Sequence, residues 1–297
     1  MKDGIKIIAY IVGVLILGCL IAPWLWYAGQ GLGGAMGWEF LTDQTFQRYF
    51  NRSMLVAAVA LLYPLIKSLR ITSWRDFGLE KNPYRWRDVL TGFLLASILL
   101  FLIGLLGFWL EVYRVQNNIV WEKFAKIPGT AIVVPLIEEW FFRAAMLSLV
   151  LRTASARTAI LFTSAIYSIV HFLKPMEVDI GSIQWFSGFQ LLPYSFHQFA
   201  EPLLLLGGFF TLFAIGVILA VSTLRTRSLW LAIGLHAGWI AGSRAFNIVF
   251  KQRDELIPWY GPRIEIGLAP LLTVIFTGIL VMIYLRYASK RPTTPMD

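Results

Sequence analysis

Long apolar runs dominate the chain, and short polar segments with most of the charges separate them. An apolar run of about 18 residues or more is long enough to cross a bilayer as a helix. The pattern predicts eight spans, at about 5–28, 51–67, 89–111, 129–151, 157–173, 202–222, 228–244 and 264–286. We therefore predict an all-α fold: a polytopic membrane helical bundle that forms a single membrane domain over residues 1–297.

The composition agrees with a membrane protein, since 58% of the residues are hydrophobic and only 14% are charged. If the N-terminus is cytoplasmic, the predicted inner loops hold the larger share of lysine and arginine, as the positive-inside rule requires. Both termini are then cytoplasmic. The net charge of +9 is explained by this orientation and predicts no nucleic-acid partner. We expect an integral, multi-pass protein of a bacterial inner (plasma) membrane, with the lipid bilayer around it.

The fourth predicted span carries three charges, on Glu138, Glu139 and Arg143. Each charge near mid-membrane costs about 2.5–3.5 kcal/mol on translocon scales, so such residues usually mark a functional site. Glu139 and Arg143 are four residues apart and lie on one helix face, which predicts an ion pair. Glu138 is rotated by about 100° from Glu139, so it has to meet a group on another helix or carry a proton. A carboxyl in that situation is a candidate general base or acid.

Two histidines also lie in predicted spans. His171 is near the end of the fifth span, with Tyr167 one turn earlier on the same face. His236 is in the glycine-rich seventh span, a composition typical of a helix packed inside protein. Both Glu138 and His236 are ~12–14 Å from the ends of their spans, which puts them near mid-membrane.

Three motifs resemble the CPBP family of intramembrane proteases, formerly called Abi, which includes CAAX prenyl proteases and bacteriocin-processing enzymes. They are Glu138-Glu139-x-x-x-Arg143, Tyr167-x-x-x-His171 and His236 in a Gly-Leu-His-Ala sequence. The resemblance covers about residues 129–250. It implies that Glu138 and His171 activate a water molecule and that His236 stabilises the oxyanion. It also implies supporting roles for Glu139, Arg143 and Tyr167.

The sequence departs from the family pattern at two positions. Tyr167 stands where phenylalanine is usual, which is a mild change. Ile240 stands where the family usually has asparagine, four residues after the last histidine, and isoleucine cannot donate a hydrogen bond. Ser243 and Asn247 lie further along the same helix. The oxyanion site is therefore expected to be weaker, completed elsewhere or absent.

The leading prediction is an intramembrane endopeptidase that cleaves a membrane-associated protein or peptide by a glutamic mechanism, without a cofactor. The alternative within this class is a zinc enzyme, since Glu138, His171 and His236 form a His₂Glu set. Against zinc, the sequence has no His-Glu-x-x-His helix and no evident carboxylate to support a histidine ligand.

Two other classes stay open. A non-catalytic membrane scaffold or chaperone that retains the family fold is favoured by Ile240. A proton-coupled transporter would use Glu138 and the histidines as a relay, but the sequence shows no repeat and no pair of broken helices.

Overall fold

The computed structural model describes residues 2–70, 77, 79–173, 175–200, 202–253, 256, 258–261, 264 and 266–288. The chain divides into two compact units, formed by residues 1–72 with 169–205 and by residues 73–168 with 206–297. The prediction of a single membrane domain stays a prediction. A helix lies at each of the eight predicted positions, so the all-α fold is confirmed.

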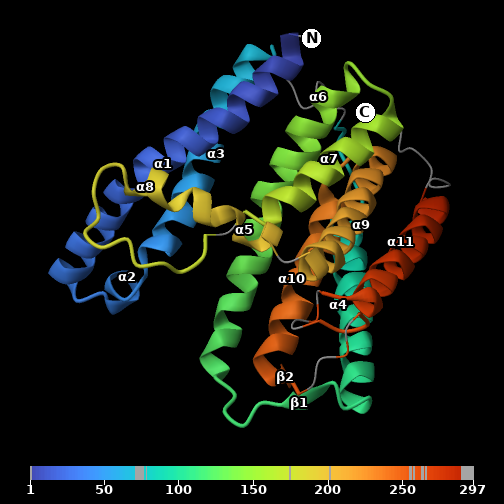
Figure 1. Cartoon of the computed structure of the whole chain (residues 1–297). Coiled ribbons are helices and arrows are strands. Elements are labelled where there is room, and N and C mark those ends of the chain that lie inside the picture. Colours follow the sequence, from blue (N-terminus) through green and yellow to red (C-terminus); the bar gives the residue numbers. More distant parts are fainter. Residues whose placement is uncertain are drawn as a thin grey trace. The chain divides into compact units, whose positions relative to one another are not determined.

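The first unit is built on two long antiparallel helices that lie side by side (Figure 1). Cys19 and Phe50, one from each, meet in its core with Leu191. Gly188 lies directly against the carbonyl of Cys19, an approach that only a residue without a side chain allows. The helices of this unit are α1 (Lys2–Met36), α2 (Glu39–Thr42), α3 (Phe46–Ser68), α8 (Ser187–Leu191) and the 3₁₀ segment η4 (Pro193–Ala200).

The second unit holds the segments that contain the candidate site. Two helices, α7 (Ala156–His171) and α9 (Pro202–Thr226), lie mostly in it and have one end each in the first unit. The other elements are α4 (Arg85–Trp109), β1 (Tyr113–Val115), η2 (Trp121–Ala125), α5 (Lys126–Glu139), η3 (Trp140–Leu147), α6 (Ser148–Leu151), α10 (Trp230–Val249), β2 (Phe250–Gln252) and α11 (Leu268–Ala288).

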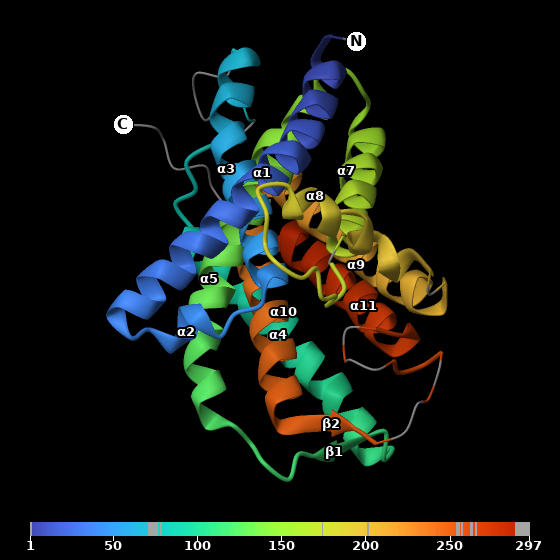
Figure 2. The ribbon, with the colours of Figure 1, turned by 60° about the vertical axis from the view of Figure 1, so that its left-hand side comes forward.

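Helices α4 and α10 pack very closely, side by side in Figure 2. A Cβ on Gly234 would overlap the carbonyl oxygen of Val89, and one on Gly92 would lie 2.7 Å from the carbonyl oxygen of Leu231. Because His236 is rotated by about 200° from Gly234, this packing turns it away from α4 and toward α5. The sequence-based prediction that this glycine-rich helix packs inside protein is confirmed, since half of the residues of α10 are buried and only Arg244 is exposed.

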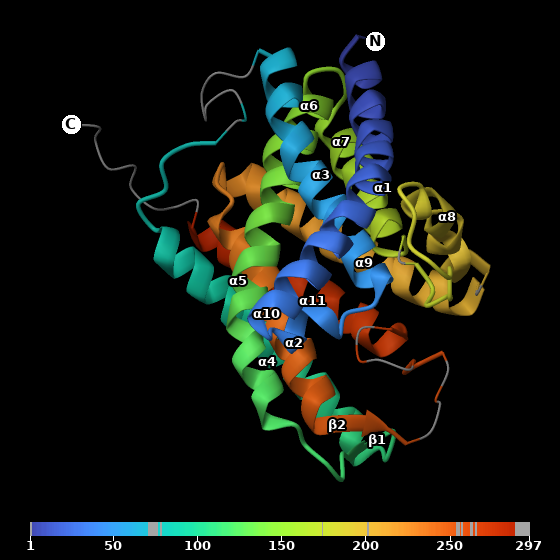
Figure 3. The same ribbon diagram turned by 90° about the vertical axis from the view of Figure 1, so that its left-hand side faces the viewer.

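A short antiparallel ribbon closes one end of the unit (Figure 3). In β1 and β2, Tyr113 is opposite Gln252. The Gln116 side-chain amide donates to the carbonyl of Asn247 at 2.8 Å, so the end of α10 is joined to the segment that follows β1.

The surface of α4 is that of a lipid-facing helix. Leu90, Leu94, Ile98 and Phe101 are exposed at three- and four-residue spacing and form one apolar stripe. Among the described residues, five helices are long and apolar enough to cross a membrane: Gly4–Met36, Phe46–Ser68, Arg85–Trp109, Gly207–Thr226 and Leu268–Tyr287. The exact count of eight spans is therefore not confirmed. The segments that do not qualify are those that carry the candidate site, because they are shorter, interrupted or more polar.

Candidate active site

The segment with the two glutamates is helical from 126 to 151, but it is not one regular α-helix. Helix α5 ends at Glu139, a π-helix (η3) follows over Trp140–Leu147, and α6 completes the segment. The sequence predicted an uninterrupted helix over 129–151, and this was wrong. π-helical turns are rare and frequently occur at functional sites, and this one begins directly after the glutamates.

Glu139 lies at the centre of a buried polar cluster and has no exposed surface. Its Oε2 atom is 3.2 Å from Nε of Arg143, so the predicted ion pair is present. Its Oε1 atom is 2.8 Å from Nδ1 of His236, a residue 97 positions later in the chain. One carboxylate thus holds a cation on its own helix and an imidazole on α10.

Arg143 and Tyr167 complete this cluster. Nη2 of Arg143 is 3.5 Å from the carbonyl oxygen of Gly216, and its guanidinium carbon is 4.5 Å from the centre of the Tyr167 ring. The same ring meets the His236 ring edge to face at 6.2 Å between centroids. Tyr167 therefore packs against both the cation and the imidazole, which supports the Glu139–Arg143 pair by a cation–π contact.

Glu138 lies on the other side of the same imidazole. Its Oε2 atom is 3.9 Å from Nε2 of His236, which is longer than a hydrogen bond. The Glu138 side chain is 20% exposed, whereas Glu139 is fully enclosed. The two neighbouring glutamates therefore face the two different nitrogens of His236, and Glu138 is the one with exposed side-chain surface.

These contacts restrict the proton positions on His236. An ionised carboxylate only accepts hydrogen bonds, so Nδ1 of His236 donates to Glu139. A neutral His236 then has a lone pair at Nε2, and only a doubly protonated ring can donate from that atom. The sequence placed His236 in one predicted site with Glu138, but no local pattern reveals its hydrogen bond with Glu139, 97 residues away.

The structure brings five of the six predicted site residues together in the second unit: Glu138, Glu139, Arg143, Tyr167 and His236. His171 is the last residue of α7 and falls in the first unit, where its side chain is half-buried. Its role beside Glu138 stays a prediction.

Ser243 and Asn247 do not take the place of the missing donor at Ile240. The hydroxyl of Ser243 is 3.3 Å from the carbonyl oxygen of Ile240 and donates to it. Asn247 is three turns beyond His236, at ~16 Å along the helix, where its carbonyl accepts from Gln116. Neither residue substitutes for the donor expected at position 240.

The zinc alternative has one feature in its favour and one against it. Glu139 behind His236 is the kind of carboxylate that orients a metal-bound histidine, so the sequence-based statement that none was evident was wrong. However, no group of three or more His, Cys, Asp or Glu side chains among the described residues could hold a metal ion.

Comparison with known proteins bears on this cluster directly. Residues 120–241 match the family model described as type II CAAX prenyl endopeptidase Rce1-like. No curated protein and no solved structure gave a significant match. The matched range includes the glutamate pair, Arg143, both motif histidines and Tyr167. Over residues 120–241 the chain is thus similar to the Rce1-like CAAX proteases of the CPBP group, the family that its motifs resemble.

Proposed function

We propose that this integral membrane protease is an intramembrane endopeptidase in which Glu138 is the general base. The observation that carries the proposal is the placement of two carboxylates on the two nitrogens of one buried imidazole. Glu139, Arg143 and Tyr167 hold His236 in position, while the Glu138 side chain is 20% exposed and faces Nε2 of His236. We expect the substrate to be a membrane-associated protein or peptide.

In the proposed reaction, Glu138 with His171 takes a proton from a water molecule, whose oxygen attacks the carbonyl carbon of the scissile amide. His236 donates from Nε2 to the oxyanion that forms. Glu138 then returns the proton to the leaving nitrogen, the C–N bond breaks, and the products are a carboxylate and an amine. General-base catalysis of this kind contributes about 10²–10⁴-fold, and one oxyanion donor about 10²–10³-fold.

The oxyanion role requires a hydrogen on Nε2 of His236. Because Nδ1 faces Glu139, only the doubly protonated ring supplies it.

The test compares membrane proteomes of cells that carry the wild-type protein or Glu138→Gln, read as new N- or C-termini. Glu177→Gln is the matched control, since Glu177 is an exposed glutamate in the first unit. We expect specific new termini with wild type and Glu177→Gln, and none with Glu138→Gln.

Two results would change the proposal. Identical termini in all three strains, with function in cells unchanged by Glu138→Gln, would favour the non-catalytic scaffold that Ile240 suggests. Stoichiometric metal in the purified protein, together with loss of cleavage after exhaustive chelation, would replace the glutamic mechanism with a metal-dependent one.

A further inference from the structure

A cleft runs along the facing sides of α5 and α10 in the second unit. It is formed by two open hollows of about 270 Å³ and about 830 Å³, which share Gln116, Arg244 and Asn247 in their linings. On α5 the lining residues are Lys126, Thr130 and Val134, which are four residues apart and therefore lie on one face of the helix. Glu138 is the next residue on that face. On α10 it is lined by Asn247, Ser243 and Ile240, and the next turn of that face carries His236. The cleft therefore leads toward the proposed reacting pair.

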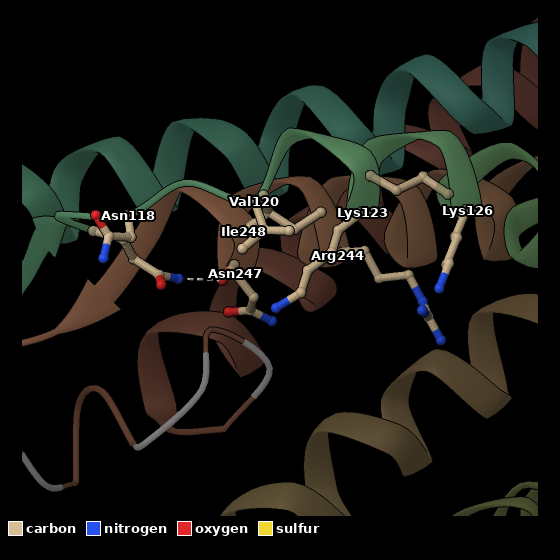
Figure 4. A pocket seen from close by; sticks show the side chains of 9 residues that line it. Asn118, Val120, Lys123, Lys126, Arg244, Asn247 and Ile248 are labelled. Carbon is tan, nitrogen blue, oxygen red and sulfur yellow. Dashed lines mark hydrogen bonds between the residues drawn. The ribbon is translucent and has the colours of Figure 1, made fainter. Parts of the chain in front are cut away.

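The far end of the cleft is cationic. Lys123, Lys126 and Arg244 line it, together with the amide side chains of Asn118 and Asn247, and no acidic residue is among the lining residues. Figure 4 shows the cationic side chains and the Asn247 amide around the same open space. None of the three cations forms an ion pair with another described residue, whereas exposed Arg227 and Arg253 of the same unit each pair with a glutamate.

Three like charges at one cavity repel each other unless an anion lies between them. The donors are also of the types that bind a carboxylate or a phosphate: one guanidinium, two ammonium groups and neighbouring amides. The chemistry at this end of the cleft is therefore that of an anion site.

The length of the cleft suggests where this anion comes from. Arg244 is eight residues from His236, which is ~12 Å along α10, and Lys126 is twelve residues from Glu138, which is ~18 Å along α5. An extended peptide covers about 3.3 Å per residue, so four or five residues of a bound chain would reach from the reacting pair to the cations. A lipid headgroup would occupy only the cationic end of the cleft, and it would not use the inner part lined by Val134 and Ile240.

We propose that this cationic end is a specificity subsite for an acidic group of the substrate chain, about four or five residues from the scissile bond. The group is a carboxylate, from an acidic side chain or a chain terminus. The inference rests on the proposed peptidase function for its orientation, since that function fixes the inner end of the cleft.

The test measures binding without turnover, on full-length Glu138→Gln protein in phosphatidylcholine nanodiscs. The probes are short fluorescent N-palmitoylated peptides with one glutamate at successive positions, each with a glutamine counterpart. We expect the glutamate peptide to bind about tenfold more tightly at one or two neighbouring positions, as charge-assisted hydrogen bonds predict. Adding Lys126→Gln and Arg244→Gln should remove this preference. Adding Arg114→Gln should not, because Arg114 is an exposed cation of β1 outside the cleft lining.

Equal binding of glutamate and glutamine peptides would overturn the subsite. A preference for glutamate that survives the double substitution would also overturn it. If the double variant lost only co-purified anionic phospholipid, the cleft would be a lipid-headgroup site instead. Cleavage by protein with Glu138 intact separates the two proposals. No cleavage of any probe, with the binding preference present, would reject the peptidase function alone. Cleavage without a binding preference would reject the subsite alone.

Discussion

The facing sides of α5 and α10 carry charge in two places, and the two places are built differently. In the middle, Glu139, Arg143 and His236 are buried and bonded to one another. At the end, Lys126 and Arg244 are exposed and line a cavity without an acidic partner. The first arrangement stabilises the protein's own geometry, and the second is suited to an anion that the protein does not supply.

This difference shows why the two glutamates have separate roles. Glu139 uses both of its oxygens within the protein, so it has little capacity left for chemistry on a substrate. Glu138 is partly exposed and faces Nε2 of His236 at more than hydrogen-bond distance. Burial and bonding of one carboxylate therefore position the imidazole for the other.

The largest effect is expected from breaking the buried pair with Glu139→Gln. This change leaves the Arg143 guanidinium buried without its carboxylate and replaces the charged acceptor of His236 with a neutral amide. Loss of one partner from a buried ion pair typically costs 3–5 kcal/mol, so we expect a destabilisation of about that size. The measurement is denaturant unfolding of the protein in mixed micelles.

The control is the double variant Glu139→Gln with Arg143→Met, which removes the stranded cation as well. It should be more stable than Glu139→Gln alone, since replacing both partners costs less than stranding one. Equal stability of wild type and Glu139→Gln would contradict the described cluster.

Much of this arrangement could be predicted from the sequence, and the reasons are local. Apolar runs located every long helix, because burial in lipid requires them. Four-residue spacing predicted the Glu139–Arg143 pair, because helix geometry fixes which side chains meet. The glycines of α10 predicted close packing, since only a residue without a side chain fits against the backbone of α4.

The rest depends on contacts between distant segments. No local signal separates the π-helical turn of η3 from an α-helix. The hydrogen bond from His236 to Glu139 joins α10 to α5, and no pattern in the sequence indicates that these two residues meet. The cationic cleft combines residues of η2, α5 and α10, whose lysines and arginine appear in the sequence as ordinary loop and helix-end charges. Their shared feature, a common cavity, exists only in the folded chain.

The second prediction concerns His236, which joins the buried cluster to the accessible glutamate. His236→Leu removes the proposed oxyanion donor, and we expect a loss of about 10²–10³ in rate, which is about 2.7–4 kcal/mol of transition-state stabilisation. The rate is measured on a substrate identified from its new termini. Substrate affinity should change much less than the rate. A variant with weakened binding and a normal maximal rate would place His236 in substrate recognition instead.

The third prediction tests the aromatic support of the buried pair. Tyr167→Leu removes the ring that packs 4.5 Å from the guanidinium carbon of Arg143, and it should destabilise the protein by about 1–2 kcal/mol. Tyr167→Phe keeps the ring and should retain most of that stability. Thermal unfolding of the two variants in the same detergent makes the comparison. If phenylalanine were as harmful as leucine, the hydroxyl and not the ring would be the supporting group.

The smallest effect is expected at Ile240, which lies between the two regions. This residue is one turn from His236, on the same face of α10, and it also lines the cleft toward Arg244. Ile240→Asn would supply a donor next to the proposed oxyanion, and one neutral hydrogen bond is worth about 0.5–1.5 kcal/mol. We therefore expect cleavage to become about two- to tenfold faster, measured on the same identified substrate, with Ile240→Val as the control for altered cleft volume. A gain shared by valine would assign the effect to space in the cleft. A gain confined to asparagine would show that this chain works with one oxyanion donor fewer than position 240 can provide.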